Sequence, residues 1–311
     1  MSAPSSIVVV GSLNADLVVG VSRFASPGET VTGHRFDVFP GGKGGNQAAA
    51  AARLGASVAM IGQVGADSQG AWLRQSLAGT GADVSLVSVD ESVSSGVALI
   101  TTDASGQNTI VVVPGANGTF APERLAPAVS RLKAARVVLL QLEIPLATVE
   151  RAAADARSAG AIVLLDPAPA RAIPDQLIAL VSIVTPNETE LASLAGVPAD
   201  TFADDDVDAL ARGLIGRGAA EVIVKLGARG ARHVTRHESR HYAAPSVTAV
   251  DTTAAGDAFN GALAVALAED RRLEDAIPFA CAAGALSVTR PGAQPSMPAR
   301  EAVLAFLRGA P

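Results

Sequence analysis

Short apolar runs alternate with helix-forming stretches along most of this chain, and this alternation constrains its fold more than any other feature. The predicted strands cover residues 7–10, 58–62, 136–143, 161–166, 181–187 and 221–227. The predicted helices cover residues 46–56, 68–81, 146–160, 188–196, 207–218 and a stretch that follows residue 257. Apolar strands joined through helices are typical of a parallel sheet with helices on both faces. We therefore predict an α/β fold with a doubly wound, mostly parallel sheet, whose ligands bind beyond the carboxyl ends of the strands.

Residues 12–40 and 96–113 interrupt the alternation, because each contains two strand-like runs with no helix between them. The turn sequences SPG and ASGQ separate the runs, which is typical of β-hairpins. We predict one domain over residues 1–311, with a small projecting β-sheet as a lid formed by approximately 12–45 and 94–114. Apolar runs such as TIVVV on open strands favour a homodimer through this lid sheet.

Composition limits the compartment and the partners of the protein. The formal net charge of −6 argues against a surface that binds nucleic acid. The single cysteine excludes an intrachain disulfide, which favours a reducing cytoplasm. No apolar run approaches the roughly 20 residues of a membrane span, and the run at 7–10 is too short for a signal peptide. We predict a soluble cytoplasmic protein that binds neither nucleic acid nor membranes.

The glycine-rich loop GGKGGN, residues 41–46, ends one predicted strand and begins a helix. It does not match the phosphate-binding loop of nucleoside triphosphatases, because Asp37 occupies the first glycine position and Gly44 follows Lys43 where Ser or Thr is needed. The dinucleotide fingerprint also fails, since GSLNAD follows the first strand. The loop is consistent with a flexible turn, but Lys43 and Asn46 among glycines also suit hydrogen bonding to a small, hydroxyl-rich ligand.

Asn14 and Asp16 lie just past the first predicted strand, and Glu143 ends a later one. Alternate residues of an extended segment point to the same side, so this amide and carboxylate can bind two neighbouring sugar hydroxyls. Asn and Asp are also common in turns, and the sequence leaves both interpretations open. Glu143 faces either the expected ligand crevice or solvent.

The segment TPNETE places Asn187 and Glu190 three residues apart at a helix start. The two residues form a capping box, or they arrange a hydrated Mg²⁺ and phosphate oxygens, and the spacing alone favours the cap. The segment KLGARG, residues 225–230, is either a hairpin turn or a backbone cradle for a nucleotide.

The segment DTTAAGD, residues 251–257, directly precedes a predicted helix. The unsatisfied N–H groups of a helix N-terminus attract anions, and Ala254, Ala255 and Gly256 leave these groups uncovered. A phosphoryl group in transit is a suitable guest, with the backbone of residues 254–257 as its anion hole. Asp257 is then predicted to be the general base that accepts a proton from the attacking alcohol. An Asp favoured by the helix dipole also explains Asp257, but not the small residues before it.

DTTAAGD resembles the D-T-x-[GA]-A-G-D signature of the ribokinase-like sugar kinase family. The resemblance runs nearly end to end, through GSLNAD, PGETVTG, GGKGGNQA, SSGVALI, QLEIPL, DPAPAR, TPNETE, DTTAAGDAFNGAL and TRPGAQPSMP. It implies a doubly wound α/β domain with a small β-sheet lid, and an enzyme that uses ATP, Mg²⁺ and a monovalent cation, usually K⁺. The reaction that it implies is phosphorylation of D-ribose at O5 to give D-ribose 5-phosphate.

The resemblance also implies a role for particular positions of this chain. It puts the sugar on Asn14, Asp16, Gly42, Lys43, Asn46, Glu143 and Asp257. It puts ATP on Asn187, Glu190, Lys225, Gly227, Ala228, Gly230, Gly256 and Cys281, where Lys225 and Cys281 replace the residues common at their positions. It puts the monovalent cation on backbone and side-chain oxygens near Asp251, Thr253, Ser287, Arg290, Gly292 and Ser296.

Other functions compete with a ribose kinase. A sister kinase of the same family, acting on deoxyribose, another pentose, fructose or a nucleoside, would share these motifs. A non-catalytic sugar-sensing protein would have lost the base or the small residues of the anion hole, and this chain retains both. A dinucleotide-dependent oxidoreductase is disfavoured because the glycine fingerprint is missing.

Overall fold

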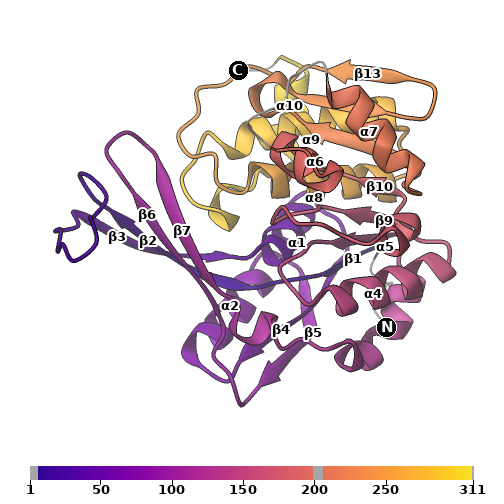
Figure 1. The fold of residues 1–311 in the computed structure, drawn as a ribbon. Helices are drawn as coiled ribbons and strands as arrows, with labels where there is room; N and C mark the ends of the chain where they lie inside the picture. The colour runs from indigo at the N-terminus through magenta and orange to yellow at the C-terminus, as the bar shows by residue number, and fades with distance from the viewer. Residues whose placement is uncertain (1–5, 199–205, 310–311) are drawn as a thin grey trace.

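The computed structural model describes residues 6–198 and 206–309. Within them the main sheet has nine strands, in the order β13-β12-β11-β10-β9-β8-β1-β4-β5. All neighbours from β5 to β11 are parallel, whereas β12 and β13 add an antiparallel hairpin at the edge, so the predicted mostly parallel sheet is confirmed (Figure 1). The strands are β1 Ile7–Val10, β4 Val58–Gly65, β5 Asp83–Asp90, β8 Val137–Leu140, β9 Ile162–Leu165, β10 Ile183–Val184, β11 Glu221–Lys225, β12 Ala231–Val234 and β13 Ser239–Tyr242.

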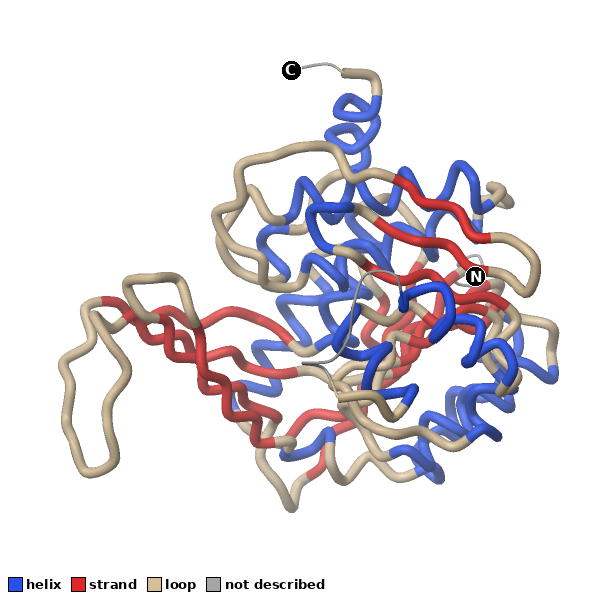
Figure 2. Tube along the Cα trace, turned by 45° about the horizontal axis from the view of Figure 1, so that its top comes forward, coloured by secondary structure: helices blue, strands red, loops and turns tan. Residues whose placement is uncertain are grey.

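Helices cover both faces of this sheet, as predicted (Figure 2). Alternate residues of β1 belong to two separate cores: Ile7 and Val9 pack with α1, α2, α8 and α9, and Val8 and Val10 pack with α3 to α7. The helices are α1 Lys43–Arg53, α2 Ser68–Ala78, α3 Val129–Ala134, α4 Leu146–Ser158, α5 Asp175–Leu180, α6 Glu188–Ala195, α7 Val207–Gly216, α8 Ala255–Ala268, α9 Leu273–Ser287 and α10 Arg300–Leu307. Short 3₁₀ turns are η1 Gly115–Asn117, η2 Pro122–Ala128, η5 Gly227–Arg229 and η6 Gln294–Ser296.

A second sheet of four strands projects from the main body (Figure 1). Its strands are β2 Asn14–Gly20, β3 Arg35–Gly41, β6 Gly96–Thr102 and β7 Asn108–Val113, in the order β3-β2-β6-β7. β2 and β3 form one antiparallel hairpin and β6 and β7 the other, and the two hairpins join through a parallel β2–β6 pairing. The two predicted hairpins therefore do form one sheet.

Several predicted element boundaries differ from the structure, and two of the differences concern strands that end early. The strand predicted over 136–143 ends at Leu140, because the N–H of Leu142 bonds to the carbonyl of Ala168 at 2.9 Å instead of continuing the ladder. The strand predicted over 181–187 contains only Ile183 and Val184, so the polar segment after it is free to form the start of α6. In the described part of the chain, no helix has both the length and the apolar character needed to span a membrane.

Candidate active site

Asp257 lies in the first turn of α8 and is almost fully buried, with 4% of its surface exposed. Both carboxylate oxygens accept hydrogen bonds from consecutive residues of α1. Asn46 Nδ2 donates to Oδ2 at 2.9 Å, and Gln47 Nε2 donates to Oδ1 at 3.0 Å. α1 and α8 can approach closely because a side chain at Gly261 would come within 2.6 Å of Ala50 Cβ. The glycine-rich loop and the DTTAAGD segment, far apart in sequence, therefore meet at one carboxylate.

The start of α8 has the form of an anion site. Ala254 is the N-cap residue, with φ of 60°, and no side chain caps the helix. The N–H of Ala255 makes a long 3.4 Å bond to the carbonyl of Thr252, and the N–H groups of the first helical turn have no carbonyl four residues earlier inside the helix. The left-handed backbone at Ala254 costs about 1–2 kcal/mol for a residue with a Cβ. This position is the one at which the signature alternates between glycine and alanine.

The pKa of Asp257 is raised to about 6, chiefly by burial and also by the nearby charge of Asp166, although Lys43 and the two amides lower it. A carboxylate with a pKa of about 6 is ionised at neutral pH and is a stronger base than a solvated one. The environment of Asp257 therefore suits it for accepting a proton.

Asn14, at the start of β2, is oriented by a second asparagine. Asn117 accepts the N–H of Leu13 at 2.9 Å and donates from Nδ2 to Asn14 Oδ1 at 2.8 Å. Because Oδ1 of Asn14 is engaged as an acceptor, its Nδ2 group is the donor that it can offer to a ligand. Gly96 permits this arrangement, since a Cβ there would lie 2.2 Å from both Asn14 Oδ1 and Asn117 Nδ2. Sequence reasoning missed Asn117, which is 103 residues from Asn14.

Asp16 is buried beside the same site, with 8% of its surface exposed. Its burial, together with the charges of Glu143 and Asp257, raises its pKa to about 7. The neighbouring Gly41 leaves room for the carboxylate, since a Cβ there would come within 2.1 Å of Asp16 Oδ2.

Glu143 and Lys43 fix the loop that leads into α1. Glu143 Oε2 accepts Ser12 Oγ–H at 2.5 Å and the N–H of Lys43 at 3.0 Å. Burial disfavours the charged form of the Lys43 ammonium, but the surrounding carboxylates, Asp257 first among them, outweigh this and raise its pKa. The structure therefore gives Glu143 a scaffolding contact that the sequence did not predict, in addition to its place near Asp16, which is one of the residues predicted to bind the sugar.

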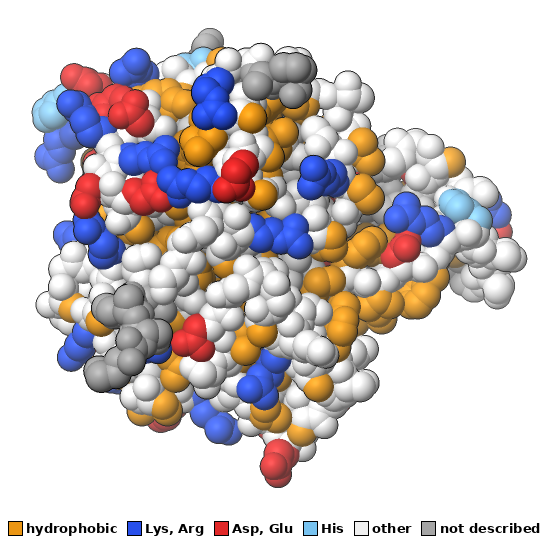
Figure 3. All heavy atoms as spheres, turned by 180° about the vertical axis from the view of Figure 1, so that it is seen from behind, with side chains coloured by type: hydrophobic (Ala, Val, Ile, Leu, Met, Phe, Trp, Pro, Cys, Tyr) orange, Lys and Arg blue, Asp and Glu red, His pale blue; other side chains and the backbone are white. Residues whose placement is uncertain are grey.

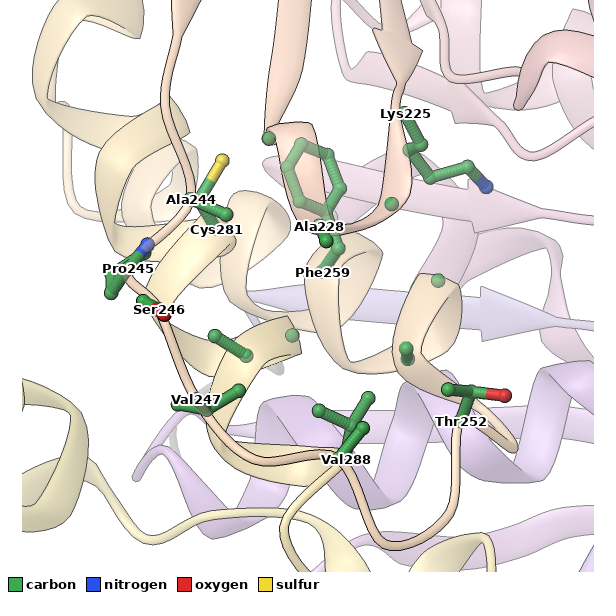
Figure 4. A pocket seen from close by; sticks show the side chains of 17 residues that line it. Lys225, Ala228, Ala244, Pro245, Ser246, Val247, Thr252, Phe259, Cys281 and Val288 are labelled. Atoms are coloured by element: carbon green, nitrogen blue, oxygen red, sulfur yellow. The ribbon is translucent and has the colours of Figure 1, made fainter.

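A cavity of about 440 Å³ lies next to the start of α8 (Figure 4). It is lined by Gly256 and by the predicted nucleotide residues Lys225, Gly227, Ala228, Gly230 and Cys281. The segment KLGARG is a hairpin turn between β11 and β12, as one interpretation predicted, and it also forms a wall of this cavity; its role as a nucleotide cradle stays a prediction. Apart from Thr252 and Ala255 of the DTTAAGD segment, sequence reasoning missed the rest of the lining, which is apolar or small and includes Ala244, Pro245, Ser246, Val247, Phe259 and Val288.

Asn187 and Glu190 form the capping box of α6. Asn187 Oδ1 accepts the N–H of Glu190 at 2.8 Å, and Glu190 Oε2 accepts the N–H of Asn187 at 2.7 Å. Burial raises the pKa of the Glu190 carboxyl, and the nearby Lys225 charge lowers it. Neither residue lines the cavity, but Glu190 Oε2 lies 3.9 Å from Lys225 Nζ.

A buried polar network joins this region to Asp257. Lys225 Nζ donates to Asp166 Oδ1 at 2.6 Å, and Gln47 Nε2 donates to Asp166 Oδ2 at 2.9 Å as well as to Asp257. Gln141 Nε2 in turn donates to Gln47 Oε1 at 2.7 Å. Sequence reasoning assigned no role to Gln47, Gln141 or Asp166, although Asp166 begins the quoted motif DPAPAR.

The six residues predicted around a monovalent cation come from two segments that meet. Asp251 accepts the N–H of Thr253 at 2.9 Å and the N–H of Gly292 at 2.8 Å, and its own N–H bonds to the carbonyl of Val288 at 3.1 Å. Ser287 and Ser296 donate to carbonyls within their own turns, and the N–H of Arg290 bonds to the Ser287 carbonyl at 3.3 Å. Their hydroxyl and carbonyl oxygens keep lone pairs for a hard cation. Among the described residues, no group of three or more His, Cys, Asp or Glu side chains has the spacing of a metal site.

Comparisons with known proteins agree with this geometry. Residues 4–300 match the family described as pfkB family carbohydrate kinase. Ribokinase from Haemophilus influenzae is 41% identical over 98% of this chain and 99% of its own length. Deoxyribokinase from Salmonella typhi is 38% identical over 95% of this chain and 96% of its own length.

A solved structure has the same fold. The structure of Arabidopsis thaliana ribokinase complexed with ribose and ATP superposes with a TM-score of 0.91 at 35% identity, covering 99% of both chains. The sequence match, the shared fold and the site at the start of α8 agree, and this chain belongs to the pfkB family of carbohydrate kinases.

Proposed function

We propose that this protein is an ATP-dependent kinase that phosphorylates D-ribose at O5, with Asp257 as its general base. One observation carries the proposal: Asp257 is buried at the start of α8, between the polar residues of β2 and α1 on one side and the 440 Å³ cavity on the other. Relatives named ribokinase, and the structure named as a ribokinase complexed with ribose and ATP, support the choice of sugar and nucleotide.

In the proposed reaction, the sugar lies against Asn14, Asp16, Lys43 and Asn46, with its O5 hydroxyl at Asp257. The hydroxyl oxygen attacks the γ-phosphorus of ATP, the bond to the β-phosphate oxygen breaks, and ADP leaves with that electron pair. The hydroxyl proton passes to Asp257. The N–H groups of Ala255, Gly256 and Asp257 donate to the transferring phosphoryl oxygens, where negative charge is spread.

The cavity beside Gly256 is proposed to hold the adenosine of ATP. Its apolar walls of Phe259, Val247 and Val288 suit a flat base, and the loop at 227–230 brings bare backbone close to the nucleotide. Asn187, Glu190, Lys225, Ala228 and Cys281 complete the proposed nucleotide residues.

Mg²⁺ and K⁺ are proposed as cofactors because the oxygen donors present suit hard cations. Glu190 would hold water molecules of a hydrated Mg²⁺ that neutralises the phosphates. Asp251 with Thr253, Ser287, Gly292 and Ser296, and the backbone carbonyl of Arg290, would hold K⁺ beside the anion site.

A single domain with a lid is proposed to act as a dimer. Strand β7 is exposed along its whole length, and the exposed residues on one face of the projecting sheet include Phe36, Leu99, Val111 and Val113. Figure 3 shows apolar side chains along this projection. An apolar sheet face with an open edge is covered when a second copy packs on it around a two-fold axis.

The test is a phosphorylation assay with ATP and a panel of sugars. Ribose is expected to give the highest kcat/KM, and ³¹P NMR should place the phosphate on O5. The deoxyribokinase relatives at 38% identity make deoxyribose the second candidate, so both sugars are compared directly. A protein that binds ribose but transfers no phosphate would instead be a sugar sensor.

A further inference from the structure

The Lys225 ammonium lies at the phosphate end of the cavity rather than at its base-binding end. Lys225 ends β11, and its Nζ donates to Asp166 Oδ1 at 2.6 Å. A Cβ added to Gly256 would lie 3.3 Å from the same Nζ, so the ammonium is next to the first turn of α8. In Figure 4 the Lys225 side chain points away from Cys281, Ala244 and Pro245, which lie across the cavity.

Lys225 has donors to spare for a ligand. An ammonium carries three N–H groups, and Asp166 accepts one of them. Glu190, at 3.9 Å, is beyond hydrogen-bond distance. Because Lys225 also lines the cavity, its remaining N–H groups are accessible to an anion that enters there.

The neighbours of Lys225 hold its charge in place. The side chain of Asp166 is 2% exposed and that of Lys225 13% exposed, so water competes little for this ion pair. Gln47 Nε2 donates to both Asp166 and Asp257, which ties the anchor of Lys225 to the proposed base through one amide. Such a fixed cation needs little rearrangement when charge develops beside it.

We infer that Lys225 is a catalytic residue that donates to a γ-phosphoryl oxygen of ATP and continues to do so while the phosphoryl group moves to the sugar. This inference rests on the proposed function. In the step, the O5–P bond forms, the bond from phosphorus to the β-phosphate oxygen breaks, ADP takes the electron pair, and Asp257 takes the hydroxyl proton. Lys225 keeps its protons throughout, and its positive charge stabilises the transferring group together with the backbone N–H groups of α8.

The competing explanation is structural: Lys225 only neutralises the buried charge of Asp166. A protein is strongly destabilised when a buried carboxylate loses its partner cation, so Lys225→Met alone would impair the protein whether the role of Lys225 is catalytic or structural. The double variant Asp166→Asn/Lys225→Met separates the two, because it removes both buried charges. Lys133→Met is the matched control, since Lys133 is exposed on α3.

Two quantities are measured on each variant: kcat at saturating ribose and ATP, and the ratio of Kd for ADP to Kd for β,γ-methylene-ATP. We expect Lys225→Met and the double variant to lose about 10²–10³ in kcat, as for removal of one donor from an oxyanion hole. The preference for the γ-phosphate analogue over ADP should fall by roughly tenfold or more, because a charge-assisted bond is lost. Lys133→Met should change neither quantity.

Recovery of kcat in the double variant to within about threefold of the unmodified protein would show that Lys225 only balances Asp166, and would overturn the inference. An unchanged preference for the analogue over ADP in both Lys225 variants would overturn it as well. Failure of the proposed function is recognised separately, because the unmodified protein would then not phosphorylate ribose.

Discussion

Replacing Gln47 with Met removes the amide that donates to the proposed base while keeping a side chain of similar size. Gln47 is fully buried, and its Nε2 bonds to Asp257 Oδ1 at 3.0 Å. This bond stabilises the ionised form of Asp257 and lowers its pKa. Its loss should therefore raise the pKa of Asp257 above the value of about 6. A general base must be ionised to act, so activity should be lost mainly at acid pH.

The magnitude follows from the strength of the lost bond. A hydrogen bond to a charged group contributes about 1.5–3 kcal/mol, and one pKa unit corresponds to about 1.4 kcal/mol. Because Asn46 still donates to the other oxygen and Lys43 still lowers the pKa, we expect a rise of about one unit, at the lower end of that range. On the acid limb, kcat of Gln47→Met should be roughly tenfold below that of the unmodified protein, and above about pH 8 the two should converge.

The assay is the pH profile of kcat at saturating ribose and ATP, with thermal melting recorded for each protein. Gln63→Met is the matched control, since Gln63 is equally buried and its Nε2 donates to Asp90 at 3.2 Å and to Thr119 at 2.9 Å. Both variants should lose about 1–3 kcal/mol of folding stability, because buried polar partners are left without a hydrogen bond. Only Gln47→Met should move the midpoint of the pH profile of kcat. An equal loss of kcat at every pH would refute the reasoning, because it would indicate altered geometry instead of a changed pKa.

Four further changes test other parts of the protein. Asp257→Asn should lower kcat by at least about 10²–10⁴ while ribose and ATP still bind in calorimetry, and a near-normal kcat would remove the base assignment. In the unmodified protein, the ribose KM should rise on acidification, because Asp16 has a pKa of about 7 and its protonation competes with its hydrogen bonds to ribose hydroxyls. Asp16→Asn should not show this rise, and a KM independent of pH in the unmodified protein would contradict the prediction. Replacing Na⁺ or a large organic cation with K⁺ should raise kcat because a cation bound near Asp251 orders the backbone of the anion site, and equal rates in K⁺ and in the organic cation would argue against a cation there. Val112→Asp places a charge on a 46% exposed position of the lid, in register with Ala98 and Asp16, and should either shift a dimer toward monomer in sedimentation or raise the ribose KM; a monomeric unmodified protein at micromolar concentration would contradict the proposed dimer.

The sequence by itself determined the architecture, because local patterns carry that information. The runs at 7–10 and 161–166 are apolar at consecutive positions, so both faces of each strand are apolar. They therefore require a sheet that helices cover on both sides. The hairpin signals at 12–40 and 96–113 were equally local, and both hairpins are present in the lid. The small residues before Asp257 also marked the uncapped helix start where we propose an anion site, since bare N–H groups at a helix start depend on a few consecutive residues.

Only the tertiary structure decided how the polar side chains are paired. Gln47 and Asp166 are 119 residues apart and Asn46 and Asp257 are 211 apart, and no local pattern specifies which buried amide meets which carboxylate. The same holds for Lys225: its sequence neighbours predict a turn, whereas the direction of its ammonium depends on Asp166 from another strand end. A hydrogen bond or ion pair in a buried site depends on the distance and angle between two groups, and the packing of α1 and α8 against the sheet sets both.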